Sequence, residues 1–144
     1  MAIRENGKRV TARGITFIDD KILIIERYRL VNGEMLHYFT IPGGGVEEGE
    51  TYEEACIRET KEETSCNVEI IKFLEKEEYD EGIVYWYLTK YLSGKPELGG
   101  EELEYNNPEN SYKLCLIPMK DIFNINILGE GKRLAIEAYL SFRR

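Results

Sequence analysis

Glutamate is the residue type whose spacing in this chain best suggests chemistry. Eight glutamates fall within seventeen positions and are offset by two basic residues, Arg58 and Lys61, so this segment carries −6 of the net charge of −8. The eight are Glu47, Glu48, Glu50, Glu53, Glu54, Glu59, Glu62 and Glu63. Such a cluster is either a solvated charged surface or a set of oxygen ligands for a cation.

Three of these glutamates share one side of a predicted helix. Thr51 and Glu54 form a capping box, T-x-x-E, which predicts a helix over residues 51–65. At about 100° per residue, Glu62 and Glu63 lie about −60° and +40° from Glu59. This stripe also holds largely apolar residues, namely Tyr52, Ala55, Cys56 and Cys66. The carboxylates are therefore expected to face inward, where their repulsion grows and a divalent cation such as Mg²⁺ or Mn²⁺ would remove it.

The alternative is a solvated helix on which Arg58 and Lys61 neutralise the neighbouring acids. The segment before the helix, Pro42-Gly43-Gly44-Gly45, is expected to form a turn whose glycines adopt positive φ and let the backbone approach a ligand. It is not a P-loop, because no Lys-Ser/Thr pair follows the glycines.

Residues 44–66 resemble the Nudix box, G-x5-E-x7-R-E-U-x-E-E-x-G-U. The matching positions are Gly44, Glu50, Arg58, Glu59, Glu62 and Glu63, and the preceding FTIPGGG at residues 39–45 is also similar to that family. Two positions depart from the pattern: Thr60 replaces the apolar residue after Arg-Glu, and Ser65 replaces the late glycine. Since that glycine usually ends the helix in a left-handed conformation, Ser65 is expected to be less comfortable there.

The resemblance implies a small MutT-like Nudix hydrolase with an α/β/α sandwich fold, a mixed β-sheet between helices. It also implies hydrolysis of a diphosphate bond in a nucleoside diphosphate linked to another group, by water that a divalent metal activates. By motif position, Glu59, Glu62 and Glu63 would hold Mg²⁺ (or Mn²⁺), with Glu50 nearby. Arg58 would orient the carboxylates through a salt bridge, and Gly43, Gly44 and Gly45 would shape the substrate-binding loop.

The general base stays open between Glu62, Glu63 and an acid of the turn-rich segment 93–110. In that segment Glu102 is the predicted substrate contact, with Glu101 and Glu104 as further candidates and solvated loop charges as the alternative. Candidates for stacking on a base, each of which could instead pack in the core, are Tyr28, Tyr38, Phe39, Trp86 and Tyr105. Features associated with ADP-ribose and dinucleoside polyphosphate hydrolases are missing, since position 80 is Asp and residues 81–83 contain no Tyr. The expected substrate is therefore a nucleoside triphosphate or another nucleotide conjugate.

The remaining elements predict an α/β or α+β sandwich. Residues 10–18 and 21–28 are expected to form a hairpin, 29–36 a loop, 37–41 a short strand, 67–79 and 83–91 two strands, and 112–117 another. A short helical turn is expected at 118–123 and a closing helix at 132–142. Residues 1–144 are expected to be a single domain.

Composition excludes several other classes. The acidic balance argues against nucleic acid and anionic membranes as partners. The longest apolar run, residues 83–88, is far shorter than the roughly 20 residues that span a bilayer. His37 is the single histidine and the three cysteines form no CxxC pair, which argues against a zinc site and for a reduced, cytoplasmic protein. A homodimer stays open, and the alternatives to an enzyme are a non-catalytic Nudix-fold nucleotide-binding or sensor module and an acidic interaction domain.

Overall fold

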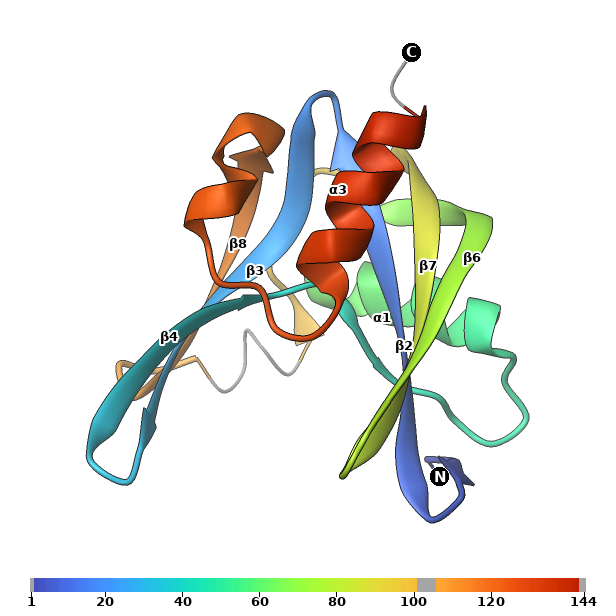
Figure 1. Cartoon of the computed structure of the whole chain (residues 1–144), viewed down its shortest axis with the longest axis horizontal. Coiled ribbons are helices and arrows are strands. Elements are labelled where there is room, and N and C mark those ends of the chain that lie inside the picture. Colours follow the sequence, from blue (N-terminus) through green and yellow to red (C-terminus); the bar gives the residue numbers. More distant parts are fainter. Residues whose placement is uncertain (1, 101–105, 143–144) are drawn as a thin grey trace.

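A mixed β-sheet with helices on both sides forms the framework of the protein (Figure 1). The computed structural model describes residues 2–100 and 106–142, and within these ranges the sheet has eight strands. The strands are β1 (Arg4–Glu5), β2 (Lys8–Ile18), β3 (Lys21–Val31), β4 (Glu34–Thr40), β5 (Gly43–Gly45), β6 (Asn67–Tyr79), β7 (Gly82–Ser93) and β8 (Asn110–Pro118). The helices are α1 (Tyr52–Thr64), the 3-10 helix η1 (Met119–Asn124) and α3 (Gly131–Phe142).

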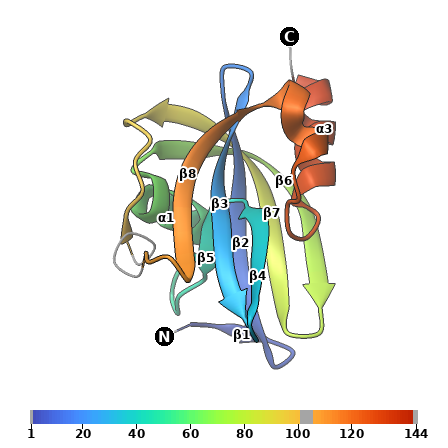
Figure 2. The ribbon, with the colours of Figure 1, turned by 90° about the vertical axis from the view of Figure 1, so that its left-hand side faces the viewer.

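The strand order is β4-β3-β2-β7-β6, with β1 and β5 also paired to β2 and β8 also paired to β3. The β2–β7 pair is parallel and the other pairs are antiparallel. Figure 2 shows α1 on one side of the sheet and α3 on the other. The predicted α/β/α sandwich around a mixed sheet is confirmed.

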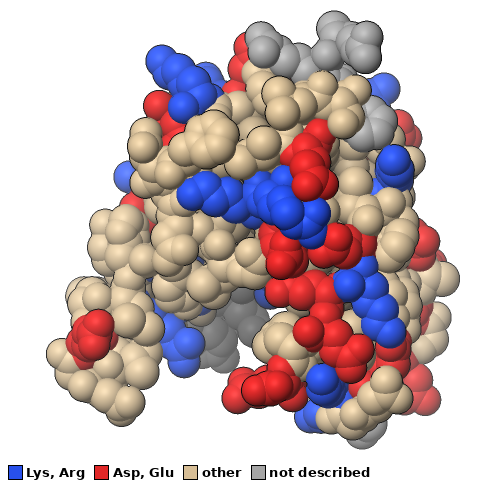
Figure 3. All heavy atoms as spheres, viewed as in Figure 1, with Lys and Arg blue, Asp and Glu red and all other residues tan. Residues whose placement is uncertain are grey.

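The sheet separates into two halves beside the β2–β3 hairpin. These two strands pair only next to the turn, at Phe17–Ile22 and Ile18–Lys21. Further along, β2 pairs with β5 and β7, whereas β3 pairs with β4 and β8. The chain crosses from one half to the other between β4 and β5, and Figure 3 shows the molecule hollowed between the projecting β3–β4 hairpin and the ends of β2, β6 and β7.

Each side of the sheet has its own core. On the α3 side, Trp86 packs with Ile15, Ile24 and Leu134. On the α1 side, Tyr87 packs with residues that include Val10, Ala12, Val46, Ala55 and Cys56. Adjacent residues of β7 therefore face opposite helices, as alternation along a strand requires.

The expected loop at residues 29–36 is wrong. β3 runs on to Val31 and β4 begins at Glu34, so a two-residue turn, Asn32-Gly33, joins them. Both turn residues have positive φ, 51° and 80°, as type I′ hairpin turns require. Asn-Gly between extended segments is the usual signal for this turn, and it was present in the sequence.

The capping box on α1 is confirmed. The Thr51 hydroxyl accepts a hydrogen bond from Glu54 N at 3.0 Å, and the Glu54 carboxylate accepts one from Thr51 N at 2.9 Å. The helix ends at Ser65, which has φ 64° and donates from its backbone N to Lys61 O at 2.9 Å. The left-handed conformation expected at this position is therefore present without a glycine.

Candidate active site

The C-terminal half of α1, strand β5 and the separated strands β2 and β3 enclose a cavity of about 530 Å³. The residues that line it are Ala2, Arg9, Arg13, Ile25, Arg27, Thr40, Gly43, Gly44, Gly45, Glu47, Arg58, Glu59, Glu62, Glu63, Gly100 and Tyr112. The three glutamates predicted as metal ligands and the three glycines predicted to bind substrate thus line a single cavity. Glu50, the remaining glutamate of the motif, reaches it through Arg58.

The glycines form strand β5 instead of the expected turn. Gly43, Gly44 and Gly45 pair with Arg13, Ala12 and Thr11 of β2, and none of the three has positive φ. Their small size is needed for packing, because a Cβ on Gly44 would lie 2.5 Å from the Glu59 carboxylate. A Cβ on Gly43 would lie 2.4 Å from the carbonyl oxygen of Ala12. The close approach expected of these glycines is therefore to the helix and to β2.

The three carboxylates of α1 differ in burial. Glu63 is 8% exposed and accepts a hydrogen bond from Gly43 N at 3.2 Å, and the Glu59 side chain is 17% exposed. Glu62 is 51% exposed, which contradicts the expectation that all three face inward. Its position about 60° from Glu59 places it at the edge of the stripe, beyond the area that β5 covers. The inward position of Glu59 and Glu63 argues against a wholly solvated helix.

Arg58 links these acids to one another and to the loop before the helix. Its guanidinium donates to both carboxylate oxygens of Glu50, at 2.6 and 2.9 Å, and to Gly45 O at 3.0 Å. Its third nitrogen donates to Glu59 at 3.0 Å and to Glu62 at 3.3 Å. These bonds hold the pKa of Glu50 below its usual range and raise that of Arg58. The predicted Arg58 salt bridge is therefore present, and Glu50 is its bidentate partner.

The donor set suits a divalent metal, although its members are arranged around Arg58. Among the described residues, no three His, Cys, Asp or Glu side chains lie close enough together to hold a metal ion as they stand. The Arg58 guanidinium donates to both Glu59 and Glu62, so it offsets their negative charge. Three carboxylates on one cavity wall are nevertheless the hard oxygen ligands that Mg²⁺ and Mn²⁺ prefer.

Basic side chains line the same cavity, and our sequence interpretation missed them. Arg9 and Arg13 extend from β2, and Arg27 extends from β3. Arg27 stacks on Tyr112, with its guanidinium carbon 3.7 Å from the ring centroid, and it also donates to Asn110 and Ser111. Arg9 and Arg13 are separated by an even number of residues on one strand, so the sequence indicates that they share one face of the sheet. That Arg27 lines the same cavity depends on how the sheet folds.

The other predicted site residues have varied positions. Glu102 lies outside the described residues, as do Glu101, Glu104 and Tyr105. Phe39 and Trp86 belong to the core on the α3 side. Tyr28 stacks on His37 with 4.2 Å between ring centroids, away from the cavity lining. Tyr112, which does line the cavity, was not among the predicted aromatic residues.

Two further observations concern the cysteines and the helices. Cys56 and Cys66 are buried and unpaired, and burial raises the pKa of the Cys56 thiol to about 12. These thiols are inert structural side chains. Among the helices that the described ranges contain, none has the length and apolar character needed to cross a membrane.

Curated proteins of similar sequence include two enzymes. An ADP-ribose pyrophosphatase from Methanocaldococcus jannaschii is 51% identical over 55 residues, which are 38% of this chain and 31% of that protein. The match thus spans about a third of the length of that relative. An 8-oxo-dGTP diphosphatase from Escherichia coli is 34% identical over 89 residues, which are 59% of this chain and 68% of that protein.

Solved structures share the fold. A hydrolase of the NUDIX family from Clostridium perfringens aligns with a TM-score of 0.69 and 22% identity, over 94% of this chain and 99% of that one. A MutT NUDIX hydrolase from Burkholderia pseudomallei aligns with a TM-score of 0.68 and 24% identity, over 90% and 96%. The family model of the NUDIX domain matches residues 7–132. The chain therefore belongs to the Nudix hydrolase superfamily, as the motif at residues 44–66 predicts.

Proposed function

We propose that this protein is a divalent-metal-dependent pyrophosphohydrolase that cleaves a diphosphate bond in a nucleoside triphosphate or another nucleotide conjugate. The supporting observation is that Glu59, Glu62 and Glu63 line the same cavity as Arg9, Arg13 and Arg27. Carboxylates that bind cations and guanidinium groups that bind phosphate are both needed to hold a metal–diphosphate complex. The activities named for the two relatives, on ADP-ribose and on 8-oxo-dGTP, belong to this class of reaction.

Nudix hydrolases act on small nucleotide substrates and generally use divalent metals. In this chain Glu59, Glu62 and Glu63 would hold the ion, with Mg²⁺ preferred and Mn²⁺ as the alternative. When bound, such an ion neutralises diphosphate charge and lowers the pKa of coordinated water.

The chain's own residues have separate tasks in this proposal. Arg58, held by Glu50, fixes the position and orientation of the Glu59 carboxylate relative to β5. Arg27, held by Tyr112 and Asn110, and Arg13, held by the carbonyl of Ile41 at 2.7 Å, present guanidinium groups toward the phosphates. The proton of the attacking water would pass to Glu62, to Glu63 or to an acid of residues 93–110, and Glu102 stays a predicted substrate contact.

A nucleotide panel with Mg²⁺, followed by identification of the products, tests the reaction. The panel includes ADP-ribose, dinucleoside polyphosphates, sugar nucleotides and normal and oxidised deoxynucleoside triphosphates. Glu62→Gln with Glu63→Gln should then abolish turnover of the best substrate. Glu53→Gln, on the exposed side of the same helix, is the matched control and should retain it.

Titration with Mn²⁺, followed by its electron paramagnetic resonance signal, measures the metal role without turnover. The double variant should bind Mn²⁺ much more weakly than the Glu53→Gln control. Undiminished turnover and Mn²⁺ affinity in the double variant would contradict the assignment of these ligands. Nucleotide binding by the wild-type protein without hydrolysis of any panel member would instead identify a non-catalytic binding module.

A further inference from the structure

A second cavity of about 340 Å³ adjoins the first and shares Arg13 and Thr40 with it. It lies on the α3 side of the sheet, where Val84 and Trp86 form a buried apolar floor. Tyr79 and Leu128 line it as well and are each 50% exposed. An apolar floor with large apolar side chains left in solvent at the rim suits a flat ring that would cover them.

The shared residues connect the two cavities in a way that suits a nucleotide. Arg13 reaches from β2 to the crossing between β4 and β5, where it donates to Ile41 O at 2.7 Å. A phosphate beside Arg13 therefore has the carboxylates of α1 on one side and the apolar cavity on the other. A ligand with a phosphate end and an aromatic end can occupy both cavities at once.

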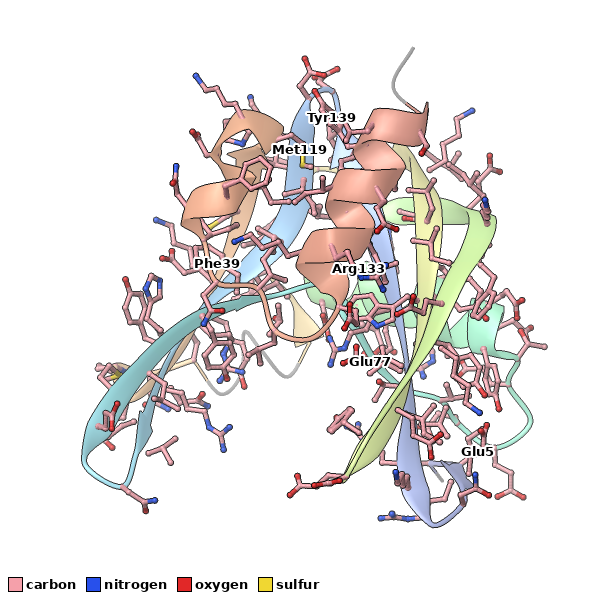
Figure 4. All side chains as sticks on the ribbon, viewed as in Figure 1. Glu5, Phe39, Glu77, Met119, Arg133 and Tyr139 are labelled. Carbon is pink, nitrogen blue, oxygen red and sulfur yellow. The ribbon has the colours of Figure 1, made fainter. Side chains whose placement is uncertain are left out.

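Glu77 is the carboxylate of the second cavity, and neighbouring groups fix its position. Its Oε1 accepts hydrogen bonds from Trp86 Nε1 at 2.9 Å and from Glu130 N at 3.2 Å. Figure 4 shows Glu77 between β6 and the beginning of α3. Both bonds go to the same oxygen, and within the described residues no donor is hydrogen-bonded to Oε2. A rigid carboxylate with one oxygen available in an apolar cavity can select a ligand edge rich in N–H donors.

We infer that the second cavity binds the base of the nucleotide and that Glu77 selects guanine. This inference rests on the proposed function, because it places the diphosphate of that substrate in the first cavity. Guanine carries two adjacent N–H donors on its pairing edge, at N1 and N2. Adenine presents an amine beside an acceptor nitrogen, and that acceptor would face the carboxylate with like polarity. Glu77 is thus assigned as a residue that determines specificity, and the donors it already binds hold it in place.

Fluorescence of Trp86 tests the inference without hydrolysis, since this is the single tryptophan of the chain. The probes are GMP, IMP and AMP, titrated in buffer containing EDTA. Each has one phosphate and no diphosphate bond, so failure of the proposed hydrolysis would leave this measurement intact. GMP should quench Trp86 saturably and bind roughly 10- to 100-fold more tightly than AMP. IMP, which lacks the 2-amino group, should fall between them.

Glu77→Gln separates the structural role of Glu77 from the proposed one. The amide oxygen can still accept from Trp86 Nε1 and Glu130 N, while the amide NH₂ takes the place of Oε2. The variant should keep the fold, as measured by thermal unfolding, and lose the preference for GMP. Glu78→Gln is the matched control, because Glu78 is the next residue of β6, pairs with Lys8 on the surface and does not line the cavity.

Three results would overturn the inference. Lack of saturable quenching by GMP would reject the cavity as a base site. Equal affinities for GMP and AMP would reject selection of guanine, and a preference that survives Glu77→Gln would reject Glu77 as its source. If Glu77→Gln unfolds, the order of the three affinities in the wild-type protein still decides the question.

Discussion

Replacement of Gly44 by Ala tests how tightly β5 sets the position of Glu59. The added Cβ would lie 2.5 Å from the Glu59 Cδ and Oε2 atoms, whereas ordinary contact begins at 3.4 Å. The carboxylate therefore has to move by about 0.9 Å. Gly44 does not have positive φ, so alanine fits the backbone without strain. A displacement of about 1 Å at a reacting group can lower the rate by about 100-fold.

The expected result is a large loss of activity with little change in stability. Catalytic efficiency, kcat/KM, on the best nucleotide of the panel should fall by about 100-fold, and Mn²⁺ affinity should fall with it. The free energy of unfolding in urea should change by no more than about 1 kcal/mol, because the displaced group is the end of a flexible side chain.

Gly43→Ala is the matched comparison for Gly44→Ala. Its Cβ would meet the backbone of β2, at 2.4 Å from Ala12 O and 2.7 Å from Arg13 Cα. Backbone cannot give way locally, so this variant should lose on the order of 1–3 kcal/mol of stability. If Gly44→Ala kept wild-type kcat/KM and Mn²⁺ affinity, or was destabilised as much as Gly43→Ala, the assigned link between β5 and Glu59 would be refuted.

Three further predictions concern α1 and its flanks. Arg58→Lys should lower the free energy of unfolding by about 1–3 kcal/mol in urea titrations, because lysine cannot donate to Glu50, Glu59 and Gly45 together. An unchanged free energy of unfolding would contradict the stabilising role assigned to the Arg58 guanidinium. Glu50 has a lowered pKa in the folded protein, so its ionised form contributes to the free energy of unfolding. This contribution should be complete above the ordinary glutamate pKa of roughly 4.3 and should be lost as the pH falls below it. Glu50→Gln should therefore weaken the acid dependence of stability, and equal dependence in both proteins would count against this pair. Ser65→Gly should raise the melting temperature, because glycine adopts the left-handed backbone conformation of this position without strain. The free energy of unfolding should rise by about 1 kcal/mol at most, and the lost hydrogen bond from the Ser65 hydroxyl to Glu97 O costs little because it lies on the surface. A lower melting temperature would mean that this hydrogen bond outweighs the strain.

Local patterns predicted α1 and its ends, because the signals lie within the helix itself. The Thr51–Glu54 capping box and the left-handed Ser65 were both confirmed. The same local method failed for β5, since three glycines have no side-chain periodicity and their strand pairing depends on Ala12 and its neighbours in β2. It also misplaced Glu62, because an angle on a helix does not show where the covering strand ends.

The arginine side of the site could not be predicted in this way. Arg13 and Arg27 line one cavity because β2 and β3 diverge after their turn, and Tyr112 stacks on Arg27 from a strand far along the chain. Such long-range pairings leave little trace in one sequence. The single-domain organisation, the cytoplasmic location and a homodimer stay predictions.

The separation of the sheet also has a thermodynamic consequence. The carboxylates of α1 and the arginines of β2 belong to one half, whereas Arg27 and Tyr112 belong to the other. β2 and β3 join the two halves through two residue pairs. A ligand that contacts both halves therefore adds a further connection between them. Bound nucleotide should therefore slow amide hydrogen exchange in β4 and β8, which hold no residue of the Nudix motif, as well as in α1. Substrate then acts as part of the framework that joins the two halves of the sheet.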